Sequence, residues 1–203
     1  MRKQMKIIGI TGGVGAGKST VLAFLRERYG AFVIQADEVG HLVMEPGMEC
    51  YESVIQLFGK EVTKNDKTID RKKVSDVVFE HPDMLQRLNE IIHPAVKRYI
   101  LRCLEEQKEN GRKLCVVEAA LFLEEHYEEF CDEVWYIYTD QEIRIRRLME
   151  SRGYTREKSL GIMENQATEE YFRTHTDRTI ENNGDLEKTW SQIQEGVEKN
   201  ETL

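Results

Sequence analysis

The feature that most constrains the fold is a glycine-rich loop, which reads Gly-Gly-Val-Gly-Ala-Gly-Lys-Ser from Gly12 to Ser19. It matches the pattern G-x-x-x-x-G-K-[ST], follows a short β-rich run at residues 6–10, and opens a predicted helix from Gly17 to about Tyr29. Glycines allow the tight turn, and the helix N-terminus adds unpaired N–H groups that face an anion. A glycine-rich turn without a ligand is the alternative, but a chance match has a probability of roughly one per cent. The loop therefore predicts nucleotide binding.

Each side chain of this loop has an expected role. Lys18 can reach the β- and γ-phosphates of a nucleotide, and the Ser19 hydroxyl can bind Mg²⁺. The expected nucleotide-binding residues of the loop are Gly13, Val14, Gly15, Ala16, Gly17, Lys18, Ser19 and Thr20.

The pattern along the chain alternates strands with helices. Four further strands are expected after the first, at residues 32–35, 114–118, 133–138 and 178–181, and an amphipathic helix at 186–197 follows. This alternation predicts an α/β fold with a mainly parallel sheet covered on both faces.

One stretch of the chain departs from this alternation. Residues 47–110 contain four predicted helices in succession, at Gly47–Phe58, Asp70–Phe79, Pro82–Ile92 and Pro94–Asn110. We therefore expect a single domain, with a core at about 1–46 and 111–203, an inserted helical subdomain at about 47–110, and a short lid at about 144–166. His93 precedes Pro94 in a pattern typical of a helix start, which favours a structural role over a catalytic one.

Composition excludes several classes of protein. The 203 residues contain 29 Lys and Arg against 37 Asp and Glu, a net charge of −8, which argues against general nucleic-acid binding. No apolar run approaches the roughly 20 residues that cross a bilayer, and the apolar run near the start is too short for a signal peptide. The four cysteines have no metal-binding spacing, so we expect reduced thiols in a cytoplasmic protein without a membrane partner.

Two carboxylates follow predicted strands. Asp37 comes directly after the second strand, at the edge of an open α/β sheet where ligands bind, and it could accept a proton from an acceptor hydroxyl. Its alternative role is a helix N-cap. Glu118 ends the third strand, where an acid could act on Mg²⁺ through water, and an ordinary strand-end carboxylate is the alternative.

The segment between Glu142 and Lys158 is basic in an acidic chain. Its cations are Arg144, Arg146, Arg147, Arg152, Arg156 and Lys158. Arg144 and Arg147 share a helix face, and the break at residues 151–156 could form a flap whose arginines close over nucleotide phosphates. A solvated helix face with pairs such as Arg146–Glu150 is the alternative.

The order and spacing of these segments resemble the dephospho-CoA kinase family from about Lys6 to Val197. The resemblance is carried by Ile10–Thr20, Ala36-Asp37, Glu45–Gly47, Leu88–Pro94, Leu121–Glu124, Arg147–Arg152, Gln166 and Asp177–Asn182. The chain has Gln35 where the family usually has Asp, Glu118 where a third strand usually ends in Asp, and Ala120 in a segment where the family usually has a proline.

The resemblance implies a fold and a reaction. The fold would be that of a P-loop NTPase, with five parallel strands in the order 2-3-1-4-5. The reaction would be ATP-dependent phosphorylation of the 3′-hydroxyl of dephospho-CoA, assisted by Mg²⁺. Separately from the resemblance, we expect a monomer. Asp37 would be the general base, with Lys18 and Arg147 as the other catalytic residues. Arg152 would contact ATP, Ser19 and Glu118 would serve the metal, and the inserted helices would hold dephospho-CoA. Another nucleoside or nucleotide kinase, or a weakly active nucleotide-binding paralogue, would share many of these features.

Overall fold

The computed structural model describes residues 5–198, which divide into two compact units. One unit comprises residues 5–33 and 111–198, and the other comprises residues 34–110. The second unit begins within the second strand, earlier than the insertion expected at 47. The reason is that the helix after this strand packs on the long helix of the same unit: Gly40 lies against Ile92 and Val96.

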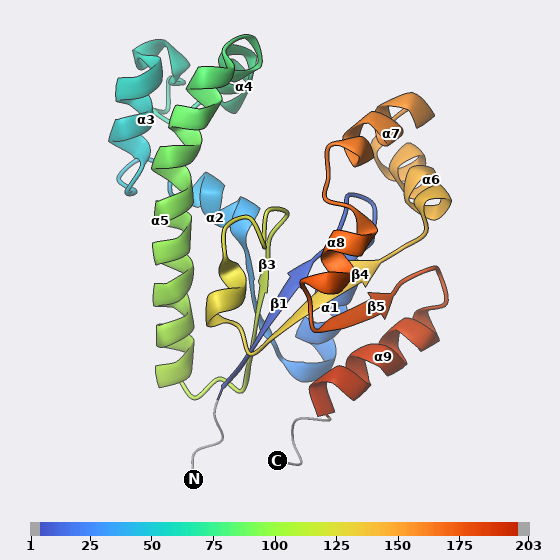
Figure 1. The fold of residues 1–203 in the computed structure, drawn as a ribbon. Coiled ribbons are helices and arrows are strands. Elements are labelled where there is room, and N and C mark those ends of the chain that lie inside the picture. The colour runs from blue at the N-terminus through green and yellow to red at the C-terminus, as the bar shows by residue number, and fades with distance from the viewer. Residues whose placement is uncertain (1–4, 199–203) are drawn as a thin grey trace. The chain divides into compact units, whose positions relative to one another are not determined.

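The sheet has five strands in the order β2-β3-β1-β4-β5 (Figure 1). The strands are β1 (Lys6–Thr11), β2 (Phe32–Gln35), β3 (Leu114–Glu118), β4 (Glu133–Tyr138) and β5 (Arg178–Glu181). The pairs β1–β3, β1–β4 and β4–β5 are parallel. Both the predicted α/β class and the strand order implied by the resemblance are confirmed.

Helices cover both faces of this sheet because successive strand residues point to opposite faces. Helices α1 (Lys18–Tyr29) and α9 (Leu186–Glu198) cover one face, where Ile8, Ile10 and Trp135 are fully buried with α1 and α9 residues. The rings of Phe24 and Trp190 stack between these two helices at 4.1 Å. The apolar stripe expected along the last helix is thus core packing.

On the opposite face, Tyr136 stacks on Phe172 of α8 (Glu169–Thr174) at a ring distance of 4.8 Å. The remaining helices of this unit are α6 (Gln141–Arg152) and α7 (Arg156–Glu164), with a short 3₁₀ turn at Tyr127–Phe130. Gly153 and Thr155 separate α6 from α7: Gly153 is left-handed, and the Thr155 hydroxyl accepts the N–H of Lys158. The predicted break of the basic helix is present.

The second unit is helical. It contains α2 (Ala36–Leu42), α3 (Tyr51–Phe58), a 3₁₀ turn at Lys60–Val62, α4 (Arg71–Glu80) and α5 (Pro82–Glu109). Asp70 caps α4 by accepting the N–H groups of Lys72 and Lys73.

The prediction of two helices, Pro82–Ile92 and Pro94–Asn110, is wrong. Helix α5 continues through Pro94 for 28 residues. Proline removes one helical N–H, but the buried residues Leu88, Val96 and Leu104 lie on both sides of it and hold the helix together by packing.

A glycine of β1 is required by close packing. An ideal Cβ on Gly9 would overlap the Phe122 ring, which is fully buried. We expect Gly9→Ala to lower the free energy of unfolding by about 1–3 kcal/mol, as overpacking of cores does. Thermal and urea denaturation measure this. The control is Gly161→Ala in α7, where a Cβ meets open space and should stabilise the helix. Equal melting temperatures for the two variants would contradict the packing argument.

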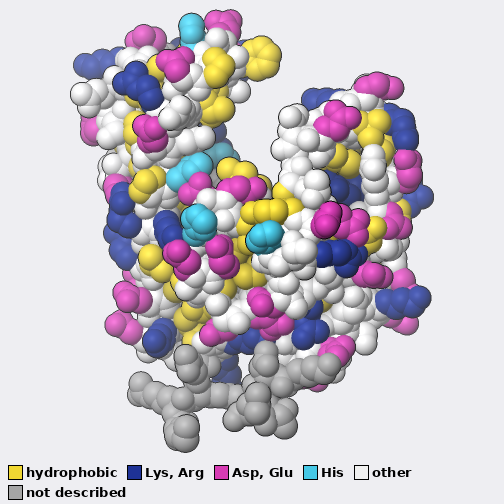
Figure 2. Space-filling view, in the orientation of Figure 1, with side chains coloured by type: hydrophobic (Ala, Val, Ile, Leu, Met, Phe, Trp, Pro, Cys, Tyr) yellow, Lys and Arg dark blue, Asp and Glu magenta, His cyan; other side chains and the backbone are white. Residues whose placement is uncertain are grey.

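Charged side chains are distributed over the surface. On the face drawn in Figure 2, Lys and Arg are interspersed with Asp and Glu rather than separated from them. Within residues 5–198, no helix has both the length and the apolar character that crossing a membrane requires.

Candidate nucleotide site

The glycine-rich loop connects the carboxyl end of β1 to the N-terminus of α1. Gly17 is the N-cap of α1 with φ of 85°, a left-handed conformation that glycine adopts without strain. A Cβ at this position would also overlap the Asn182 amide. The loop therefore leads into α1 as the phosphate-binding motif requires, and the first N–H groups of α1 lie at the end of the loop.

Lys18 lies in the first turn of α1 and turns back over the loop. Its Nζ donates to the Gly12 carbonyl at 2.7 Å and lies 3.6 Å from Oε1 of Glu118. Glu118 is the last residue of β3 and is only 7% exposed. Because β3 is parallel to β1, with Glu118 in register with Ile10, the carboxylate and the loop share the carboxyl edge of the sheet. The structure thus brings Lys18 and Glu118 together.

The carbonyl of Ala16 accepts hydrogen bonds from outside the loop. Its donors are the Thr139 hydroxyl at 2.9 Å, the Asn182 amide at 2.8 Å and the Arg147 guanidinium at 3.4 Å. Thr139 and Asn182 are buried. The N–H of the same planar peptide group belongs to Gly17 and points away from these donors.

The peptide groups of Val14 are held in a similar way. Nε of Arg144 donates to the Val14 carbonyl at 2.8 Å, and the Val14 N–H donates to Oε1 of Gln166 at 3.1 Å. Nη2 of Arg144 donates to the same Gln166 oxygen at 2.9 Å. Burial lowers the pKa of the Arg144 guanidinium. These residues fix the first half of the loop.

The arginines of the expected lid have different surroundings. Nη2 of Arg147 also donates to the Asn182 carbonyl at 2.9 Å, and burial lowers its pKa, with a smaller contribution from Arg146. Arg152 ends α6 and is exposed. Arg156 forms a two-pronged ion pair with Glu142 on the surface. Arg144 and Arg147 therefore contact the loop backbone, whereas Arg156 belongs to a solvated pair.

Residues 5–198 contain no cluster of three or more His, Cys, Asp or Glu side chains that could enclose a metal ion. Mg²⁺ does not need such a cage beside a nucleotide, because it keeps waters and takes substrate phosphates with one or two protein groups. Ser19 is exposed in the first turn of α1, and Glu118 supplies a carboxylate at the same edge of the sheet. The residues present fit a magnesium ion held mainly by phosphates.

Asp37 belongs to the helical unit. It is exposed and lies in the first turn of α2, immediately after β2. Gln35 is the N-cap of this helix, so Asp37 does not take the capping position considered from the sequence. Its carboxylate therefore has no capping bond to lose.

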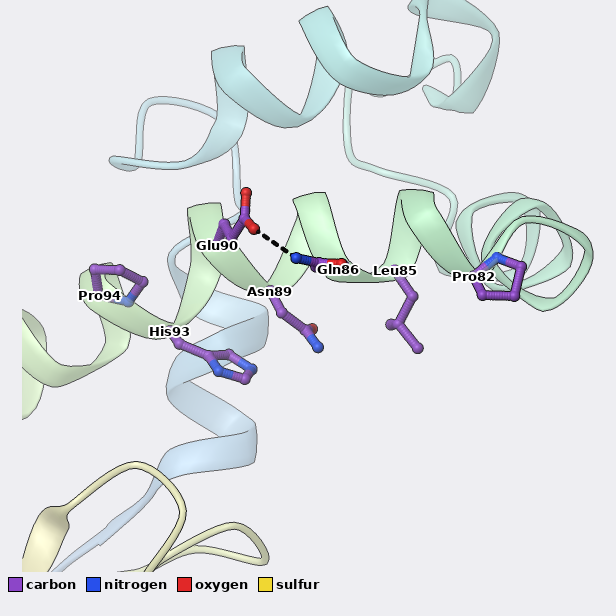
Figure 3. A pocket seen from close by; sticks show the side chains of 7 residues that line it. All are labelled: Pro82, Leu85, Gln86, Asn89, Glu90, His93 and Pro94. Atoms are coloured by element: carbon purple, nitrogen blue, oxygen red, sulfur yellow. Dashed lines mark hydrogen bonds between the residues drawn. The ribbon is translucent and has the colours of Figure 1, made fainter.

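A shallow groove of about 560 Å³ runs along α5 in the same unit. Figure 3 shows Leu85, Asn89 and His93 directed to one side of the helix, while Gln86 donates to Glu90 at 3.1 Å. The lining combines apolar carbons with amide and imidazole groups, which suits a ligand that has both kinds of surface. His93 lies in the groove lining.

Sequence reasoning missed the residues that brace the loop. Thr139 was not singled out, Asn182 and Gln166 entered only through the family resemblance, and Arg144 entered only as a member of a basic cluster. Their contacts with the loop span 123 to 166 residues of sequence, so local spacing contains no signal for them. Thr139 and Asn182 do follow β4 and β5 directly, and strand-end positions are where such a signal could be sought.

A braced glycine-rich loop after β1 of a parallel sheet in this order defines a P-loop nucleotide-binding protein with the fold of small-molecule kinases. The family model described as Dephospho-CoA kinase matches residues 6–188. The chain belongs to the dephospho-CoA kinase family.

Individual relatives agree with this assignment. A dephospho-CoA kinase of Symbiobacterium thermophilum is 36% identical over 94% of this chain and 79% of its own length. One of Listeria monocytogenes is 34% identical over 96% of both chains.

Solved structures extend the comparison. A crystal structure from Thermus thermophilus has a TM-score of 0.82 at 30% identity and covers 98% of both chains. The fold is shared with a dephospho-CoA kinase from Campylobacter jejuni, with a TM-score of 0.72 at 24% identity over 96% of this chain and 98% of the other. A shikimate kinase from Acinetobacter baumannii also shares it, with a TM-score of 0.56 at 16% identity over 98% of this chain and 96% of the other.

Proposed function

We propose that this protein transfers the γ-phosphoryl group of ATP to the 3′-hydroxyl of dephospho-CoA, which yields coenzyme A and ADP. The observation that carries this proposal is the phosphate loop, with Lys18 in place over it, in a chain that matches the dephospho-CoA kinase family over residues 6–188. The protein would act as a monomer in the cytoplasm.

The nucleotide half of the reaction belongs to the loop. Loop N–H groups such as those of Gly15, Gly17 and Ser19, together with the Lys18 ammonium, would hold the β- and γ-phosphates and stabilise the charge that builds up on them. Ser19, with Glu118 acting through water, would hold Mg²⁺, which neutralises phosphate charge when it is bound. When ATP binds, the Lys18 ammonium would leave the Gly12 carbonyl and donate to phosphate oxygens, which are acceptors with a higher negative charge.

The acceptor half of the reaction belongs to the helical unit. The groove along α5 offers carbons, amides and an imidazole, and the pantetheine arm of dephospho-CoA has both amide and alkyl parts. Asp37 would accept the proton of the 3′-hydroxyl. The hydroxyl oxygen would form a bond to the γ-phosphorus of ATP while the bond between that phosphorus and ADP breaks. Phosphoryl transfer requires mainly this positioning and charge stabilisation.

A coupled assay of ADP release tests the proposal. Purified protein is given ATP and Mg²⁺ with dephospho-CoA, and in parallel with a panel of nucleosides and nucleotides. Transfer to dephospho-CoA, with the 3′-phosphate identified by mass spectrometry and NMR, is the expected result. Activity with a nucleoside alone, or ATP binding without transfer to any acceptor, would refute it.

The arginines of α6 provide a graded prediction. We expect Arg147→Gln to lower kcat about tenfold or more, because charged hydrogen bonds to the loop and to ATP would be lost. Arg152→Gln should lower kcat as well. Arg156→Gln should change kcat little, because Arg156 is paired with Glu142 on the surface and such a pair contributes little to stability. Steady-state rates measure transfer, and calorimetry measures dephospho-CoA binding, which should stay near that of the wild type. Small and equal effects at all three positions would show that neither Arg147 nor Arg152 acts on ATP.

A further inference from the structure

The position of Gln166 is set by its own backbone. It lies two residues beyond α7, and its N–H donates to the Met163 carbonyl at 3.1 Å. This turn directs the side chain at the phosphate loop, where Oε1 accepts the Val14 N–H and Nη2 of Arg144. Arg144 completes the circuit through its bond to the Val14 carbonyl. The Gln166 amide oxygen therefore accepts from both the Val14 N–H and the Arg144 guanidinium. That guanidinium in turn donates to the Val14 carbonyl.

The chemistry of this oxygen matters. The Arg144 guanidinium is partly buried and cannot shed its charge, so its donors need acceptors. A neutral amide oxygen supplies one without placing a negative charge next to a loop that binds an anion. Because both the N–H and the C=O of Val14 are engaged, the peptide planes on either side of Val14 are fixed before a nucleotide arrives. Fixing them in advance reduces the ordering cost of binding.

We propose that Gln166 is a positioning residue for the nucleotide: its side-chain oxygen holds Val14 and Arg144 in the arrangement that receives the phosphates. The proposal rests on the nucleotide half of the proposed function and does not depend on the acceptor. Its action passes through Arg144 and Val14 rather than through the reacting atoms. It also joins the end of the basic α6–α7 segment to the loop.

Gln166→Leu removes the acceptor with little change in size. We expect the dissociation constant of ATP, titrated calorimetrically without acceptor, to rise about tenfold, which corresponds to about 1.4 kcal/mol. The ATP KM should rise with it, while the KM of dephospho-CoA stays within twofold. Gln192→Leu is the matched control, because the Gln192 oxygen also accepts a backbone N–H, that of Glu181 at 2.9 Å, away from the loop.

A double-mutant cycle separates positioning from a general structural role. In an Arg144→Lys background, which lacks the forked donors, Gln166→Leu should weaken ATP binding threefold or less. An undiminished tenfold effect in that background would overturn the proposal, as would ATP binding by Gln166→Leu within twofold of the control. Equal rises in the KM of both substrates would overturn it too. Gln166→Met replaces the Leu variant if the latter does not fold, as judged by its melting curve.

The two proposals fail in different ways. If the wild-type protein binds ATP but transfers nothing to dephospho-CoA, the proposed acceptor is refuted. The double-mutant cycle can still be measured in that case, because its readout is ATP binding. Wild-type activity with an unaffected Gln166→Leu variant refutes only the role of Gln166.

Discussion

Asp37→Asn is expected to lower kcat for transfer to dephospho-CoA about 10² to 10⁴-fold, the range that a general base contributes. Asparagine has nearly the same size and remains at the same exposed position in the first turn of α2. It lacks the negative charge and the ability to take a proton. ATP affinity should change little, because the phosphate loop belongs to the other compact unit.

The control for this variant is Glu38→Gln, which neutralises the adjacent exposed carboxylate in the same turn. Each variant loses one favourable charge near a helix N-terminus, about 0.3–1 kcal/mol, so their melting temperatures should agree. Turnover, ATP binding and melting are measured on the same preparations. If Asp37→Asn keeps its turnover, or if Glu38→Gln loses as much, Asp37 is not the base.

Lys18→Ala is expected to reduce turnover at least 10²-fold, because the transition state loses a charged donor in the phosphate site. The fold should persist. The Lys18 ammonium contacts the Gly12 carbonyl and Glu118 at the sheet edge, and the alanine variant leaves the strand and helix packing untouched. Turnover is measured with saturating dephospho-CoA, and folding is measured by circular dichroism.

Lys188→Ala serves as the control for Lys18. Lys188 is a strongly exposed lysine of the same unit, paired only loosely with Asp185 at 3.4 Å. It should retain wild-type turnover. A folded Lys18→Ala variant with near-wild-type turnover would show that the loop is not the site of the transferred phosphate.

Much of the fold could be predicted from the sequence because its signals are local. The buried runs at Leu114–Glu118 and Glu133–Tyr138 are bounded by polar turns, and both are strands in the structure. The helix predicted to end at about Tyr29 does end there, at Gly30 in a left-handed conformation. The exception is Pro94, where a local signal for a helix start was overridden by packing along α5.

The candidate site was predictable only in part. The glycine loop with Lys18 is a contiguous motif, and Glu118 is recognisable as a strand-end acid. The contacts that hold Ala16 and Val14 come from separate elements that meet only in three dimensions. Their donors are polar side chains whose types are common on any surface, so nothing in their local sequence marks them.

The bracing of the loop also has a consequence for how the protein is made. A ribosome releases the glycine loop early, but Thr139, Gln166 and Asn182 emerge 123 to 166 residues after the loop residues they hold. The hydrogen bonds of α1 are local, whereas the loop before it gains its last partner only when Asn182, directly after β5, has emerged. The phosphate loop is thus one of the first segments to be translated and one of the last to gain all of its contacts. A nascent chain halted before β4 would carry the whole phosphate-binding motif without Thr139, Gln166 and Asn182, the residues that hold it.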